Sequence, residues 1–319
     1  MLGFAAYFAG SASKPRPLQA ALASLPVRWG SRGYASRPMN RTIAALALLL
    51  STCTSFAWHD TGHMVVAEIA YRHLQPWARA MADSLLNVGG DAKTRSFVTA
   101  SCWADDYKSQ RDGPWHYINI HFRTDGKPAT MKPLAENVVW AIRRHTEILR
   151  DRNALALDRA NALRYLIHFV GDIHQPMHCV ARDTEQFPEG DRGGNDFRVV
   201  SPEHLDPKPR NLHFLWDMGG GLFRSVKRPL DAQGAATLSR LADQAMRAHP
   251  RSDFAKELAV TDPEAWAADG HDLAVRIAYD MRENSVPNER YLKRCRELSL
   301  ERVALAGYRL AVLLNAKLK

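Results

Sequence analysis

Histidines and aspartates on apolar backgrounds are the residues of this chain with the spacing to perform chemistry. His168 and Asp172 lie four residues apart in an apolar segment, and His213 and Asp217 repeat that spacing in a second one. On a helix, residues four apart project from one face. Neither segment holds a matching Lys or Arg, although buried charges need compensation. The two pairs therefore predict a carboxylate and imidazole site for more than one metal ion.

His178 adds a further imidazole to this pattern. It follows Asp172 by six residues, and Pro176 between them should end or kink a helix and turn the His178 ring toward a neighbouring position. The structural alternative is that each pair is an ordinary hydrogen-bonded ion pair or a core histidine. Two pairs together with His178 weaken that alternative. Because no cysteines cluster, the donors favour Zn²⁺ or another borderline metal over an iron–sulfur cluster.

A secretory signal precedes these residues. Residues 39–57 combine a positive end at Arg41, an apolar stretch too short to span a bilayer, and the small-x-small sequence Ser55-Phe56-Ala57. Residues 1–38 contain no acidic residue and are interpreted as an upstream extension or disordered leader, with a transit peptide as the alternative. Cleavage between Ala57 and Trp58 would deliver residues 58–319 to the periplasm or the exterior.

Such a cleavage would also create a metal ligand. An α-amine has a pKa near 8, so the amine of Trp58 can lose its proton to a metal, and amine plus carbonyl oxygen close a five-membered chelate. The competing possibility is acylation of Cys53 in a weak lipoprotein-like box, which would leave Trp58 inside the chain. The threonine before Cys53 argues against it.

The composition changes once the leader is set aside. Residues 1–57 hold six of the 43 Lys and Arg residues and none of the 34 Asp and Glu residues, so residues 58–319 carry a net charge near +3. A net charge this small gives no indication that the protein binds duplex DNA. The length suits one domain, because the sequence has no linker or repeat. Cys102, Cys179 and Cys295 allow at most one disulfide and one free thiol.

The periodicity predicts a single all-α domain with one or two small β-hairpins. Apolar residues recur at three- and four-residue spacing in several segments, which is typical of amphipathic helices. Residues 187–200 are rich in Gly, Pro and Asp in the middle and apolar at the ends, which favours a short hairpin with an exposed tip. The expected helices are Met64–Arg72, Leu134–Leu149, Asp158–Val170, Ala232–Ala248, Pro263–Met281 and Leu298–Leu314.

Several motifs follow one another over residues 58–319. They are Trp58 with the run to His63, Ser101-Cys102-Trp103-Ala104-Asp105, Trp115-His116-Tyr117, His168 to Asp172, Gln175 to His178, Gly193-Gly194-Asn195 and Asn211 to Asp217. In these motifs the sequence resembles the zinc-dependent single-strand-specific nucleases and 3′-nucleotidases of the S-one/P-one type, within the phospholipase C-like superfamily. The resemblance implies a mostly helical domain that holds three zinc ions in a cleft.

The resemblance assigns the ligands as follows. It places one zinc ion on Asp105, His116, His168 and Asp172, and a second on His178, His213 and Asp217. The third would take the amine and carbonyl oxygen of Trp58, His63 and a shared oxygen of Asp172.

Such a cluster suits phosphodiester hydrolysis. Two zinc ions roughly 3.5–4 Å apart can share a hydroxide and aim it at phosphorus, while a third neutralises the phosphate. Asp105 would orient the nucleophilic water. The family uses an arginine where this chain has Lys108, and because lysine is a point charge, its clamp on the transition state is expected to be weaker.

The resemblance also indicates where a base would bind. Tyr117 could stack on it, or belong to the core, and Asn119 stands where the family often has an aspartate, so the base preference is expected to be broader or altered. Gly193, Gly194 and Asn195 would form part of the cleft wall. The remaining histidines match no ligand position and are expected at the surface or at caps, with His174 facing away from the ligands.

The expected function is therefore hydrolysis of single-stranded DNA and RNA to 5′-phosphomonoesters, with activity on 3′-nucleotides. The expected protein is a monomer without a stable protein partner or membrane association. A zinc phospholipase C is the first alternative, disfavoured because His63 follows Trp58 by five residues and position 217 is aspartate rather than glutamate. A non-catalytic zinc-binding protein is the second.

Overall fold

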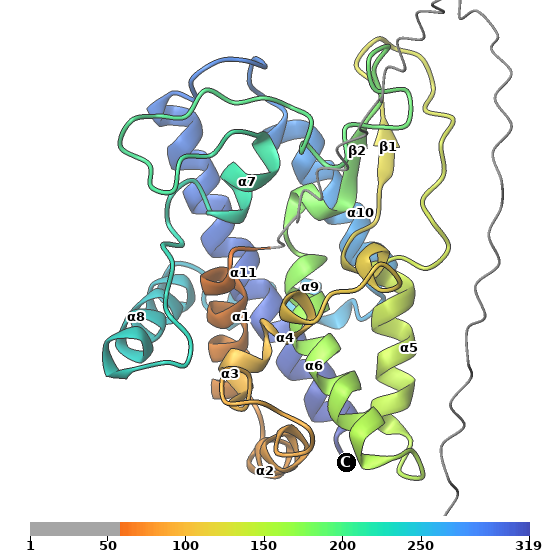
Figure 1. Ribbon diagram of the computed structural model, residues 1–319, viewed down its shortest axis with the longest axis vertical. Coiled ribbons are helices and arrows are strands. Elements are labelled where there is room, and N and C mark those ends of the chain that lie inside the picture. Colours follow the sequence, from red (N-terminus) through yellow and green to blue (C-terminus); the bar gives the residue numbers. More distant parts are fainter. Residues whose placement is uncertain (1–57) are drawn as a thin grey trace, which may run out of the picture. The chain divides into compact units, whose positions relative to one another are not determined.

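The computed structural model describes residues 58–319, so the predictions for residues 1–57, including the signal and its cleavage, lie outside it. The described chain is mainly helical (Figure 1). Its helices are α1 (Asp60–Arg72), α2 (Pro76–Leu86), α3 (Phe97–Ala100), α4 (Trp103–Asp106), α5 (Val138–Arg150), α6 (Ala156–Asp172), α7 (Leu212–Asp217), α8 (Ala232–Ala248), α9 (Ala255–Ala259), α10 (Pro263–Leu273) and α11 (Glu289–Lys317). Short helical turns are η1 (Gly113–His116), η2 (Pro176–Cys179), η3 (Arg251–Phe254) and the π-helical η4 (Ala274–Ala278).

All six predicted helices are present, with differences at their ends. α5 begins four residues later than expected because the Asn137 side chain accepts hydrogen bonds from the amides of Val139 and Trp140, an N-cap. The predicted helix from Pro263 to Met281 changes to π-helical geometry at Ala274 and ends before Tyr279. Helix α2 was not predicted from the sequence.

The centre of the fold is formed by α1, α6 and α11, with α5 beside α6 and α8 beside α1 (Figure 1). Helix α11 packs along α1, and Gly307 marks their closest approach, since a Cβ there would lie 2.6 Å from Cβ of Ile69 and 3.0 Å from the carbonyl oxygen of Val66. Burial of apolar side chains between these helices is the main source of stability. This packing fixes α1 relative to α6, and both helices carry predicted ligands.

The predicted hairpin at residues 187–200 is wrong. The described sheet consists of β1 (Ile120–Phe122) and β2 (Val180–Arg182), which pair in parallel. Residues 187–200 instead wrap in turns around the buried carboxylate of Asp191, which accepts hydrogen bonds from the amides of Arg182 and Gly194 and from the Tyr279 hydroxyl. A buried carboxylate needs such donors, and this requirement outweighs the preference of the apolar ends of the segment to pair as strands.

The one disulfide that the sequence allows is not formed, and Cys102, Cys179 and Cys295 are all free, buried thiols. Cys102 precedes α4, whereas Cys179 lies in η2 and Cys295 in α11. Cys179 lies against the carbonyl oxygen of Ile173 at 3.3 Å, and Cys102 against that of Asp60 at 3.7 Å. None of the helices in the described part of the chain is both long and apolar enough to cross a membrane.

The close approach at Gly307 generates a stability prediction. Alanine gains about 1 kcal/mol in helix propensity, but overpacking of a fixed helix pair costs roughly 3 kcal/mol. We therefore expect Gly307→Ala to lower the free energy of unfolding by about 2 kcal/mol in urea denaturation. Gly113→Ala is the matched control, because its Cβ would have no neighbour closer than 4.0 Å. Equal stability of the two variants would contradict the packing argument.

Candidate metal centre

Eight predicted side-chain ligands come together in one buried cluster. They form three groups of His and Asp side chains whose donor atoms lie within 4.8 Å of one another in each group. His63 comes from α1, Asp105 from α4, His116 from η1, His168 and Asp172 from α6, His178 from η2, and His213 and Asp217 from α7. Helix α6 ends at Asp172, two residues beyond the predicted end. As predicted, the chain changes direction at Pro176, where η2 begins, so that His178 returns to the cluster.

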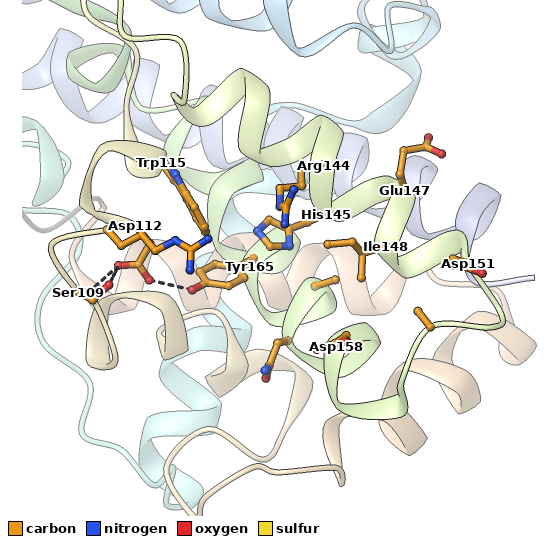
Figure 2. A pocket seen from close by; sticks show the side chains of 14 residues that line it. Ser109, Asp112, Trp115, Arg144, His145, Glu147, Ile148, Asp151, Asp158 and Tyr165 are labelled. Carbon is orange, nitrogen blue, oxygen red and sulfur yellow. Dashed lines mark hydrogen bonds between the residues drawn. The ribbon is translucent and has the colours of Figure 1, made fainter.

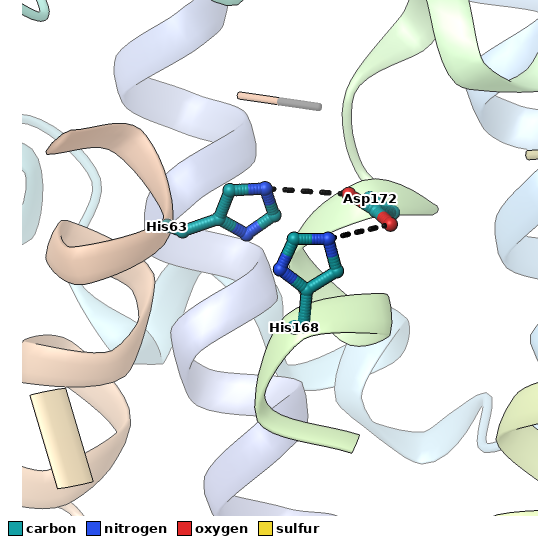
Figure 3. A group of neighbouring side chains, drawn as sticks. All are labelled: His63, His168 and Asp172. Carbon is teal, nitrogen blue, oxygen red and sulfur yellow. Dashed lines mark ion pairs between the residues drawn. The ribbon is translucent and has the colours of Figure 1, made fainter. Parts of the chain in front are cut away.

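Asp172 is at the middle of this cluster and is fully buried. Its Oδ1 lies 3.3 Å from Nε2 of His63, and its Oδ2 lies 3.2 Å from Nε2 of His168 and 3.1 Å from Nδ1 of His116. Figure 3 shows the rings of His63 and His168 turned toward this carboxylate from neighbouring helices. Gly171 makes room for His63, since a Cβ there would lie 2.7 Å from Nδ1 of that ring. The single carboxylate thus contacts three imidazoles.

Asp105 completes the second group. Its Oδ1 lies 3.6 Å from Nδ1 of His116, and its Oδ2 lies 3.7 Å from Nε2 of His168. These separations exceed hydrogen-bond distance. Oδ1 of Asp105 has no hydrogen-bond partner although it is buried. The separations leave room for a cation between a carboxylate and two imidazoles.

The third group is formed by His178, His213 and Asp217. Nε2 of His178 lies 3.2 Å from Nε2 of His213, and Nε2 of His213 lies 3.6 Å from Oδ2 of Asp217. The other carboxylate oxygen of Asp217 accepts a hydrogen bond of 2.6 Å from Gln175 Nε2. Gln175 was missed as a functional residue by the sequence analysis, although a polar residue directly before Pro176 is a signal for a capping position.

Backbone carbonyls fix the direction of the imidazoles. Nδ1 of His168 donates to the carbonyl oxygen of Ser101 at 2.6 Å, Nδ1 of His178 to that of His116 at 2.7 Å, and Nδ1 of His213 to that of Gly193 at 2.7 Å. In neutral rings, Nε2 then carries the lone pair. The lone pairs of His178 and His213 then face each other, an arrangement that a cation between them would stabilise. Histidine ligands in metal sites are typically oriented in this way.

The charges of the cluster support the same interpretation. Burial, together with the neighbouring His178, lowers the pKa of His213 to about 3, so that this ring is neutral. Burial, with smaller contributions from the charges of Asp105 and Asp172, raises the pKa of Asp217 well above its ordinary value, although the hydrogen bond from Gln175 opposes the shift. Burial also opposes a charge on Asp172, but the imidazole of His168 and the hydrogen bonds of the cluster outweigh it and hold the pKa of Asp172 well below its ordinary range.

The pKa of His168 is raised, in contrast to that of His213. Burial would lower its pKa, but Asp172 and Asp105 outweigh that and raise it to about 9. A proton on His168 thus occupies a place where a cation is favourable. Nitrogen and oxygen donors with unpartnered buried atoms, and no sulfur, fit a divalent metal such as zinc.

Comparison with known proteins identifies the protein family. The sequence profile of the S1/P1 Nuclease family matches residues 58–319. The chain belongs to the S1/P1 nuclease family. It is therefore a nuclease, a hydrolase that acts on phosphodiester bonds. The family assignment agrees with the predicted resemblance and favours the nuclease over the phospholipase C and non-catalytic alternatives.

Individual relatives span fungi and plants. The chain is 26% identical to Nuclease S1 of Aspergillus oryzae over 299 residues, which covers 86% of this chain and 96% of that protein. It is 29% identical to Nuclease P1 of Penicillium citrinum over 169 residues, covering 50% of this chain and 57% of that protein. It is 26% identical to Endonuclease 2 of Arabidopsis thaliana over 294 residues, covering 86% of this chain and 94% of that protein.

Two further predicted site residues of this S1/P1 nuclease lie beside the cluster. The Lys108 ammonium lies 3.7 Å from Oδ1 of Asp105, and its positive charge lowers the pKa of His116 in addition to the larger effect of burial. Trp58 is fully buried, and its Nε1 donates to the carbonyl oxygen of Gly171 at 3.0 Å, next to Asp172.

The predicted base-binding residues differ from one another in burial. Tyr117 and Asn119 are half-buried, so Tyr117 is not a fully buried core residue. Gly193 and Gly194 are buried and have positive φ angles, whereas Asn195 is half-buried. A Cβ at position 193 would lie 2.3 Å from the carbonyl oxygen of Met177, so only glycine fits there. The carbonyl of Gly193 itself is directed at His213. The structure therefore relates Gly193 to ligand orientation.

Two histidines predicted at the surface are buried instead. Nδ1 of His174 donates to the carbonyl oxygen of Val170 at 2.7 Å, and Nε2 accepts from Arg309 at 2.9 Å. Burial and the positive charge of Arg309 hold the pKa of His174 well below its ordinary value, so the ring is neutral. As predicted, His174 belongs to none of the three groups. The second buried histidine is His145.

His145 borders a cavity of about 670 Å³ next to the loop that joins Lys108 to His116 (Figure 2). Its ring stacks on Tyr165 with 4.4 Å between centroids. The Tyr165 hydroxyl donates to Asp112 at 2.8 Å, and the other oxygen of Asp112 accepts from the amide and hydroxyl of Ser109 at 2.6 Å. These contacts anchor the loop to α6.

His145 makes stability depend on pH. Burial, with a smaller contribution from Arg144, lowers its pKa from 6.5 to about 4 in the folded state. The unfolded chain therefore binds more protons between these values, and the stability contribution present above pH 6.5 is lost as the pH falls toward 4. For wild type relative to His145→Phe, we expect an additional loss of about 2 kcal/mol between pH 7 and pH 5 in urea unfolding. Parallel pH profiles would contradict this assignment.

Proposed function

We propose that this nuclease is a zinc-dependent endonuclease that hydrolyses single-stranded DNA and RNA to 5′-phosphomonoesters and also removes phosphate from 3′-nucleotides. The observation that carries the proposal is the presence of three His and Asp groups in one buried cluster, two of which share His168, with the Nδ1 atom of His168 bonded to a backbone carbonyl so that Nε2 faces the other ligands. The names of the relatives, Nuclease S1 and Endonuclease 2, support the same activity class. We further propose a monomer without a stable protein partner, exported after cleavage before Trp58.

Three zinc ions are the proposed cofactors. The first would be held by Asp105, His116, His168 and Asp172, and the second by His178, His213 and Asp217. The third would bind the amine and carbonyl oxygen of Trp58, Nε2 of His63 and an oxygen of Asp172. Nε2 of His63, which lies 3.3 Å from Oδ1 of Asp172 and has no hydrogen bond, supports this assignment. When bound, such ions lower the pKa of water toward 7 and neutralise phosphate charge.

The protein itself supplies orientation and charge. In this proposal Asp105 is a catalytic residue, because its Oδ1, which has no hydrogen-bond partner, can accept a hydrogen bond from the attacking water and orient it. Lys108 is the second, because its ammonium beside Asp105 can meet the negative charge that develops on the phosphate oxygens. As a point charge without a guanidinium fork, Lys108 holds the phosphate with less geometric specificity than arginine.

The base-binding proposal concerns Tyr117, Asn119 and the turn from Gly193 to Asn195. Tyr117 directly follows the ligand His116, and its half-buried ring can stack on a base. The Asn119 amide can both donate to and accept from a base edge. Gly193, Gly194 and Asn195 would line the cleft beside the second zinc ion, since the Gly193 carbonyl contacts His213.

Replacement of the central carboxylate tests this proposal. We expect Asp172→Asn to lower activity on single-stranded DNA by at least about 10³-fold, because a neutral amide removes the shared anionic ligand of two ions. Elemental analysis should find fewer zinc ions per chain than in wild type. Phosphatidylcholine serves as a control substrate that neither protein should cleave. Full turnover by Asp172→Asn would show that the site is assigned incorrectly.

The position of the N-terminus provides an independent prediction. Adding one residue before Trp58 converts its amine to an amide that cannot bind metal, so we expect native mass spectrometry to find two zinc ions instead of three. A protein that begins at Trp58 is the control. Three ions in the extended protein would exclude the amine as a ligand.

A further inference from the structure

The first residues of the described chain are held by residues 223–228, which we call the clasp. The rings of Trp58 and Phe223 meet edge to face with centroids 5.3 Å apart. Thr61 Oγ1 donates to the carbonyl oxygen of Arg224 at 2.7 Å and accepts from the amide of Val226 at 3.1 Å. Packing and hydrogen bonds thus fix this segment to the clasp at both Trp58 and Thr61.

Arg228 ends the clasp and joins two carboxylates. Its Nη2 and Nε lie 2.8 and 3.0 Å from Oδ2 of Asp60, while Nη1 and Nη2 lie 2.6 and 2.9 Å from the two oxygens of Asp106. The Arg228 side chain is 10% exposed. A planar guanidinium can satisfy both carboxylates at once, which a lysine ammonium cannot do with the same geometry.

The two carboxylates belong to segments that supply proposed ligands. Asp60 opens α1 two residues after Trp58 and one turn before His63, whereas Asp106 directly follows Asp105. Neither Asp60 nor Asp106 is a member of the three ligand groups. Without Arg228 their like charges would repel each other and separate the two segments. The salt bridge therefore lies where the N-terminal and Asp105 segments meet.

We propose that Arg228 is a positioning residue of the metal centre. By joining Asp60 to Asp106, it holds Trp58 and His63 at a fixed position relative to Asp105, so that the ion bound by the N-terminus is retained. This inference rests on the proposed function, since it requires the three-zinc site. Mutation of residues that orient ligands without binding metal typically lowers metal affinity by about 10–100-fold.

Helix α1 provides a matched control at its other end. Arg72 also joins two carboxylates, with nitrogens 2.7 Å from Glu68 and 2.6 Å from Asp243, and its side chain is 27% exposed. It lies twelve residues after Asp60, about 18 Å along the helix axis at 1.5 Å per residue. Removal of Arg72 thus tests loss of an arginine bridge on the same helix far from the ligands.

The experiment compares zinc release from wild type, Arg228→Met and Arg72→Met, with a chromogenic chelator and elemental analysis. We expect Arg228→Met to release one ion per chain at least about tenfold faster than wild type, and Arg72→Met to release it at the wild-type rate. Thermal unfolding measures the stability loss of both variants. Equal release rates for Arg228→Met and wild type, or equal acceleration in both variants, would overturn the inference.

Asp106→Asn keeps the test decisive if Arg228→Met does not fold. It removes one carboxylate of the bridge, and we expect zinc release to accelerate in the same direction by a smaller factor. Unchanged release in this variant would also overturn the inference. If the proposed function is wrong, the wild-type protein itself would contain no stoichiometric zinc. This result distinguishes failure of the proposed function from failure of the inference about Arg228.

Discussion

The buried carboxylate of Asp172 is the constraint on which the site depends. A buried anion is costly unless opposite charge or hydrogen-bond donors surround it. Here three imidazoles, from His63, His116 and His168, surround Asp172 within 3.3 Å. Their rings can act as donors in the protein alone or as ligands around a cation. The same geometry thus serves stability without metal and coordination with it.

Much of the fold arranges neighbours for this carboxylate. Helix α6 supplies both Asp172 and His168, and Gly171 between them leaves the space that His63 occupies. The close packing of α11 on α1 at Gly307 then sets how near α1 comes to α6. Core packing and ligand geometry are therefore coupled, since a shift of α1 would move His63 away from Asp172.

The sequence predicts the parts of the site that depend on local spacing. His168 with Asp172, and His213 with Asp217, lie on one helix face because four residues make about one turn. The hairpin prediction failed because the conformation of that segment depends on distant partners. The buried Asp191 takes donors from β2 and Tyr279. Whether the three cysteines pair is likewise set by the tertiary fold, which leaves all three thiols free and buried. The bridge made by Arg228 is invisible in sequence for the same reason, since it lies 168 residues from Asp60.

The two ends of the site are held by different kinds of contact. His178, His213 and Asp217 are oriented by hydrogen bonds of their own side chains, with the carbonyl oxygens of His116 and Gly193 and with Gln175. His63 has no hydrogen bond at either ring nitrogen. Trp58 and the helix that carries His63 are held instead by a hydrogen bond to Gly171, by the clasp and by helix packing. The N-terminal part of the centre therefore depends most on packing around it, and a salt bridge that fixes this segment has more effect there than elsewhere.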